Sequence, residues 1–103
     1  MNKNNNTSFG EYIRHLREER KFPLRKIAFE LDIDISTLSK IEKNERNANE
    51  QIIDKLSEIF NLNKSDLKII YLSDKITYQL LKEEDGLEIL KVAEEKIKYH
   101  KLQ

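Results

Sequence analysis

Hydrogen-bonding side chains gather in one short segment near the middle of the chain, residues 35–41, which reads ISTLSKI. Hydroxyl groups donate and accept hydrogen bonds, and an ammonium group donates them. On the exposed face of a helix, such groups can bind the polar edges of another molecule, or they can simply be solvated. The segment is therefore a candidate binding surface. Whether it binds another molecule depends on the elements that position it.

Motifs typical of enzymes and metal sites do not occur in the sequence. The two histidines, His15 and His100, lie far apart, and neither has metal-ligand spacing around it. There is no HExxH motif, glycine-rich phosphate loop or nucleophile motif. The carboxylates are numerous but recur on the polar faces of amphipathic segments. We therefore expect no catalytic site, no metal site and no cofactor.

The composition predicts an all-α protein. The chain has 103 residues, the common length of one domain, with 38% hydrophobic and 37% charged residues. Two glycines and one proline leave little material for hairpins. Strands would require alternating polar and apolar residues between turn signals, and such stretches are hard to find.

Three features of the sequence indicate a cytoplasmic protein with no membrane partner. No cysteine is present, so neither disulfides nor cysteine-bound metals are possible. No apolar run approaches the roughly 20 residues that a membrane-spanning helix needs. The first residues, MNKNNNTS, lack the apolar segment of a signal peptide. We expect residues 1–7 to form a disordered polar arm.

Capping signals and apolar spacing predict where the helices begin and end. Ser8 and Glu11 have the spacing of a capping box, Pro23 suits a first helical position, and Asp34 suits an N-cap. Either Asn47 or Asn49 caps a fourth helix. The first three expected helices span residues 8 to about 20, 23–31 and about 35–43. The fourth has its apolar positions within 52–60, and the fifth opens at 63–66 and carries an apolar stripe to residue 80. After an interruption at 82–86, the last helix runs from 87 to about 99.

The tight connection at residues 31–34 has the features of a helix-turn-helix unit, two short helices joined at a steep angle by three or four residues. Ala28 provides a small residue where the two helices cross. Asp32 can adopt the left-handed conformation that such a turn requires, and Ile33 fills the corner. Leu38 and Ile41, three residues apart, would bury one face of the second helix.

The region from Phe9 to Tyr71 resembles the Cro/repressor-type helix-turn-helix regulators of the XRE family. The segments that carry the resemblance, in the family's order and spacing, are IRHLREER, LRKIAFELDID, ISTLSKIEKNER and LSEIFNLNKSDL. The resemblance implies a five-helix repressor-type domain over residues 8–71, with additional C-terminal helix or helices over 72–103. It also implies that Arg17 pairs with Glu42, which would hold the second helix of the unit against the domain.

The sequence departs from the family's pattern at four positions. Relatives commonly carry glycine where this chain has Asp32, Asn44 and Asn61, all residues that tolerate a left-handed backbone. A glutamine that touches the DNA backbone in relatives is replaced by Leu24, so no such contact is expected there.

The resemblance implies double-stranded DNA as the partner, with residues of about 35–43 lying in the major groove. Outward side chains would read bases, with Lys40 suited to guanine, Ser36 and Thr37 to several base edges, and Ile35 to a thymine methyl. Phosphates would be held by flanking residues, namely Arg25, Lys43, Arg46 and Asn47. The alternative is that these side chains are only solvated surface groups.

A net charge of zero suggests few phosphate contacts per chain, which favours a homodimer on a roughly palindromic site. The apolar stripe that would pair two chains comprises Leu72, Ile76, Leu80 and Leu90; it could instead fold back onto its own core. An alternative function is an antitoxin-type module whose C-terminal helices bind a partner protein. The compact size also resembles controller proteins of restriction–modification systems. No separate domain for a small-molecule effector is evident.

Overall fold

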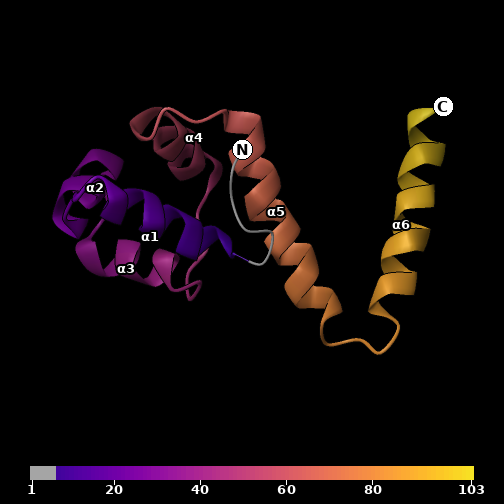
Figure 1. The fold of residues 1–103 in the computed structure, drawn as a ribbon. Helices are drawn as coiled ribbons and strands as arrows, with labels where there is room; N and C mark the ends of the chain where they lie inside the picture. Colours follow the sequence, from indigo (N-terminus) through magenta and orange to yellow (C-terminus); the bar gives the residue numbers. More distant parts are fainter. Residues whose placement is uncertain (1–6) are drawn as a thin grey trace. The chain divides into compact units, whose positions relative to one another are not determined.

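The computed structural model describes residues 7–103, and this range contains six helices and no strand. The helices are α1 (Phe9–Glu19), α2 (Leu24–Leu31), α3 (Ile35–Glu42), α4 (Glu50–Ile59), α5 (Lys64–Leu80) and α6 (Gly86–Lys101), as Figure 1 shows. The all-α prediction with added C-terminal helices is therefore confirmed. Of the expected disordered arm, residues 1–6 lie outside the described residues.

The chain divides into two compact units. The N-terminal unit ends at Tyr71, and the C-terminal unit runs from Leu72 to Gln103. Helix α5 begins in the first unit and ends in the second. None of the helices in the described range is long and apolar enough to cross a membrane.

Side chains from the preceding loops cap three of the helices. Ser8 and Glu11 form a reciprocal capping box at α1, in which the Glu11 carboxylate accepts the Ser8 backbone N–H at 3.2 Å. This hydrogen bond lowers the pKa of Glu11. Asn49 accepts the Ile52 N–H at 2.8 Å at the start of α4, and Asn63 accepts the Asp66 N–H at 3.0 Å at the start of α5.

The start of α2 differs from the expectation, and the start of α3 agrees with it. Pro23 is the N-cap of α2 rather than its first helical residue, because its extended backbone (ψ 157°) precedes the first turn. Asp34 occupies the N-cap position of α3, but its side chain makes no capping hydrogen bond. Of the two candidates for the α4 cap, Asn49 takes the role and Asn47 does not.

Helices α1 to α4 all end on a left-handed residue that is not glycine. These residues are Lys21, Asp32, Asn44 and Asn61, with φ between 54° and 63°. In each case the left-handed residue and the one after it donate their N–H groups to carbonyls of the last helical turn, as in a Schellman motif. Asp and Asn tolerate the left-handed conformation better than most residues, whereas Lys21 adopts it although lysine has no such preference.

The core of the N-terminal unit is formed by all of α1 to α4 and the first part of α5. Helix α3 packs against α1 and α2, and α4 packs against α2. The largest fully buried side chains are those of Phe60, Ile13, Ile27, Leu38, Ile41, Leu56 and Leu67. Tyr71 closes the unit, since its ring packs edge-on against Phe9 and its hydroxyl accepts the Ala48 N–H at 3.0 Å.

The C-terminal unit lacks a core of its own, because no residue from 72 to 103 is buried. Helix α6 has 16 residues and buries none of them. Helices of this length are marginally stable in water unless an amphipathic face is packed. This unit therefore leaves apolar surface available to another molecule.

Candidate nucleic-acid interface

Helix α3 has one buried face and one exposed face. Leu38 and Ile41 are 0% and 1% exposed and point into the core, whereas Ile35 is 50% exposed. Ser36 and Lys40 are exposed and Thr37 is half-buried. The four residues expected to read bases therefore lie on the side of α3 that the core does not cover. Thr37, which is half-buried, lies nearest to the edge of that side.

The turn before α3 is tight because the backbone reverses at Asp32. This residue has φ 59° and ψ 45°, and its N–H donates to carbonyls of the last turn of α2. The Ala28 carbonyl also accepts the Ile33 N–H at 3.0 Å. Ala28 itself is 2% exposed, so a small residue lies where α2 meets α3.

A two-point ion pair holds the C-terminal end of α3. Arg17 of α1 donates from Nε to Glu42 Oε2 at 2.7 Å and from Nη2 to Glu42 Oε1 at 3.0 Å. Its third group, Nη1, donates to the Phe22 carbonyl at 2.9 Å. The hydrogen bond to Glu42 raises the pKa of Arg17, and the side chains of the pair are only 12% and 5% exposed. Such a paired fork fixes geometry as well as adding energy.

A second contact joins the same end of α3 to the start of α1. The Asn44 side chain accepts the Gly10 N–H at 3.1 Å through Oδ1 and donates to Ser8 Oγ at 2.8 Å through Nδ2. A Cβ at Gly10 would lie 2.5 Å from the Glu42 carbonyl oxygen and 2.6 Å from that of Ile41. Only glycine fits this approach.

The positioning roles of Gly10 and the Asn44 side chain were not predicted from the sequence. The one available signal was a glycine inside a helix, in a chain with only two glycines. Gly10 is the second residue of α1, and glycine is a less favourable helix residue than alanine, so its presence there is a signal of a close backbone approach.

The expected phosphate-binding residues lie at the borders of the helix-turn-helix unit, and all are exposed. Arg25 is in the first turn of α2 and Lys43 is the C-cap of α3. Arg46 and Asn47 follow in the connection to α4. Within the described residues, no ion pair engages Arg25, Lys40, Lys43 or Arg46. Cations of this kind can pair with an incoming polyanion without breaking an internal contact.

Acidic side chains are exposed on the same unit, including those of Asp32, Asp34 and Glu45. Asp34 is exposed at the N-terminal end of α3, where its carboxylate makes no capping hydrogen bond. A carboxylate beside an approaching phosphate would be repulsive. In the described part of the chain, no group of His, Cys, Asp or Glu residues has an arrangement that could hold a metal ion.

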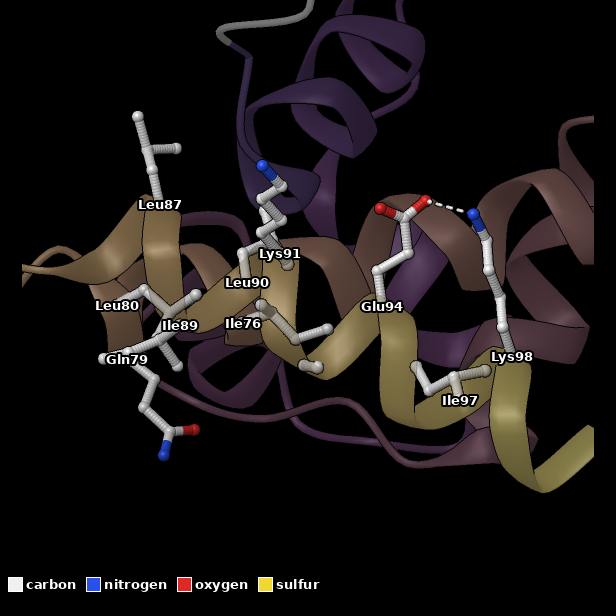
Figure 2. A pocket seen from close by; sticks show the side chains of 11 residues that line it. Ile76, Gln79, Leu80, Leu87, Ile89, Leu90, Lys91, Glu94, Ile97 and Lys98 are labelled. Atoms are coloured by element: carbon white, nitrogen blue, oxygen red, sulfur yellow. Dashed lines mark ion pairs between the residues drawn. The ribbon is translucent and has the colours of Figure 1, made fainter.

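The four residues expected at a dimer interface all lie in the C-terminal unit. Leu72, Ile76 and Leu90 are 44%, 50% and 44% exposed, and Leu80 is half-buried. Three of them, Ile76, Leu80 and Leu90, line a groove between the end of α5 and α6 (Figure 2).

The comparison with protein families gives one result. Residues 10–71 match the family described as "Helix-turn-helix domain". This match covers more than half of the 103 residues and includes every element of the N-terminal unit from α1 to Tyr71. No curated protein and no solved structure gives a significant match to the chain. The chain belongs to the helix-turn-helix domain family.

Proposed function

We propose that this protein is a sequence-specific regulator of transcription of the XRE type, which binds double-stranded DNA as a homodimer on a roughly palindromic operator. Helix α3 lies in the major groove. The observation that carries the proposal is that α3 is fixed on one side and exposed on the other. Leu38 and Ile41 are buried in the core and the Arg17–Glu42 pair holds the end of the helix, while the polar side is exposed to solvent. A rigid helix with an uncovered polar face suits base readout.

Each exposed residue of α3 has a role in this proposal. The Lys40 ammonium donates to guanine O6 or N7, and the hydroxyls of Ser36 and Thr37 pair with base edges. Ile35, at 50% exposure, packs against a thymine methyl. An exposed isoleucine beside hydroxyls and a lysine matches the mixture of methyl and polar groups in the major groove.

Phosphate contacts by Arg25, Lys43, Arg46 and Asn47 position the helix and carry no sequence information. Four such contacts, opposed by Asp34 in a chain of zero net charge, give one chain a small electrostatic contribution to binding. Two chains on two half-sites double these contacts. This is the physical reason for proposing a dimer.

A second candidate function is an antitoxin-type module that binds a partner protein through its C-terminal helices. The observation that favours it is the exposed apolar surface of the C-terminal unit, where Leu81, Leu87 and Leu102 are 72%, 85% and 87% exposed. Under this candidate another protein covers the C-terminal unit, so self-association of the chain is not required. The homodimer predicts a species of about twice the 12.3 kDa monomer mass in sedimentation equilibrium.

The DNA-binding proposal is tested by selecting a duplex from a randomised pool with the full chain and then measuring three variants on it. Lys40→Ala is expected to lose roughly 1–3 kcal/mol of binding free energy and to relax the preference at one base pair. Arg46→Ala is expected to weaken binding to all sequences alike and to lower the salt slope by about 1. Lys82→Ala, the same change in the exposed connection between α5 and α6, is the matched control and should bind normally.

Equal losses for Lys40→Ala and Arg46→Ala on selected and scrambled duplexes would contradict base reading by α3. Failure of the pool to yield any preferred sequence would contradict sequence-specific binding altogether.

A further inference from the structure

The groove in the C-terminal unit is a surface without a partner inside the chain. It has a volume of about 800 Å3 and is lined by Ile76 and Leu80 of α5 together with an apolar stripe of α6, namely Leu87, Ile89, Leu90, Ala93 and Ile97. Figure 2 shows these side chains from both helices around the groove, with the Glu94–Lys98 ion pair on α6 beside them. Because α6 buries none of its own residues, covering this stripe would stabilise the helix.

The charges of α6 and of the segment before it are separated by sign along the chain. Residues 83–95 contain six acidic residues and one lysine, whereas residues 96–101 contain three lysines and no acidic residue. This order suits the dipole of each helix, which favours anions at the N-terminus and cations at the C-terminus. It also determines how two copies can pair. Parallel α6 helices would place like charges together at both ends, and antiparallel helices would place opposite charges together at both ends.

We propose that the occupant of this groove is α6 of a second copy of the chain, running antiparallel to the first. The inference rests on the homodimer in the proposed function and gives that dimer its geometry. Its two supports are the charge order of residues 83–101, acidic at the start and basic at the end, and the apolar stripe that the monomer leaves uncovered.

The stripe itself fits an antiparallel two-fold pairing. Leu90, Ala93 and Ile97 are spaced by three and four residues and so share one face of α6. Ala93, the smallest of them, lies near the middle of the helix, where a two-fold axis would bring the backbones closest together. With the axis there, Leu90 of one chain meets the partner's Ile97. Lys101, four residues after Ile97 and on the same side of α6, lies toward the partner's Glu84, which lines the adjoining part of the groove.

Disulfide crosslinking tests the direction of pairing, since the chain has no cysteine of its own. Two single variants, Leu90→Cys and Ile97→Cys, are prepared with tags of different size, mixed and oxidised. Antiparallel pairing predicts the mixed crosslinked dimer, because each new thiol faces the other position. In that geometry the two thiols of a Leu90→Cys homodimer are separated by seven residues along the helix axis. At about 1.5 Å per residue this is roughly 10 Å, which is too far for a disulfide.

A charge-exchange experiment provides the second measurement and needs no covalent bond. Glu84→Lys and Lys101→Glu should each weaken the homodimer by about tenfold, because two contacts per dimer become like-charged. An equimolar mixture of the two variants should regain the affinity, because both contacts are again between opposite charges. Glu95→Lys makes the same charge change on the opposite side of α6 from the stripe and is the control, with no expected loss.

Mixed crosslinks together with recovery in the charge-exchanged mixture support the proposal. Crosslinks only within each single variant would show parallel pairing and overturn it. A chain that sediments as a 12.3 kDa monomer at micromolar concentration would also overturn it, and with it the dimer. Neither negative result bears on base reading by α3, which the duplex titrations of Lys40→Ala measure separately.

Discussion

Replacing Gly10 by alanine has two effects of opposite sign on the free energy of unfolding. Alanine is the better helix residue by about 0.5–1 kcal/mol, so propensity alone predicts a more stable protein. The new Cβ, however, would lie 2.5 Å from the Glu42 carbonyl oxygen, 2.6 Å from that of Ile41 and 2.7 Å from Asn44 Oδ1. Two of these atoms belong to the backbone at the end of α3, which cannot rotate away. Displacing them carries the usual cost of overpacking, about 1–3 kcal/mol.

We therefore expect Gly10→Ala to lower the free energy of unfolding by about 1 kcal/mol, and by at most about 2.5 kcal/mol, once the gain in propensity is subtracted. For a domain of this size the melting temperature should fall by roughly 4–8 °C for each 1 kcal/mol lost. Urea unfolding and thermal melts followed by far-UV circular dichroism measure both quantities. Ser65→Ala is the matched control, since Ser65 is the exposed second residue of α5 as Gly10 is the second residue of α1, and it should change little. A Gly10→Ala protein as stable as the parent would refute the close approach of α1 to α3.

Four further predictions concern single positions. Lys21→Gly should raise the free energy of unfolding by about 1 kcal/mol, because glycine adopts the φ of 56° without the penalty that lysine carries; an unchanged melt would contradict this. Ala28→Leu should cost about 1–3 kcal/mol in urea unfolding by forcing α2 away from α3, and no loss would mean that the helices do not meet there. Glu11→Gln removes a carboxylate whose pKa is lowered in the folded state, so the parent should be the more stable protein above pH 4.5 and lose this advantage as the pH falls below it, whereas a pH-independent difference would contradict the capping role. Asp34→Asn should tighten binding to selected and scrambled duplexes alike by roughly two- to fivefold in anisotropy titrations, and no change would place Asp34 away from the phosphates.

Local signals in the sequence were sufficient for the helices and for most of their ends. The capping box at Ser8 and the left-handed residues Asp32, Asn44 and Asn61 depend on neighbours within a few positions, and each is readable from residue type. Lys21 was missed, because the backbone there is imposed by the turn into α2 and not by any preference of lysine. Asp34 occupies the N-cap position of α3 as expected, but its side chain does not make the hydrogen bond to the first turn that its residue type allows.

Contacts between distant parts of the chain were harder to predict. The pair of Arg17 and Glu42 was expected only through the resemblance to known regulators, because the residues are 25 positions apart. The approach of Gly10 to the Ile41 and Glu42 carbonyls and the hydrogen bonds from Asn44 depend on how α1 crosses α3, which no local pattern specifies. The roles of Ile35, Ser36, Thr37 and Lys40 remain predictions, since exposure shows that a side chain can make a contact and not which contact it makes.

The central claim is that the exposed face of α3 reads DNA sequence, and the ratio of specific to nonspecific affinity tests it most directly. The full chain is titrated at one salt concentration with the selected duplex and with a scrambled duplex of the same composition. The double variant Ser36→Ala/Lys40→Ala is then measured in the same way. The parent should prefer the selected duplex by about a thousandfold or more, and the double variant should lose most of that preference while its affinity for the scrambled duplex changes little. A parent protein that binds both duplexes equally, or a double variant that keeps the full preference, would contradict sequence reading by α3.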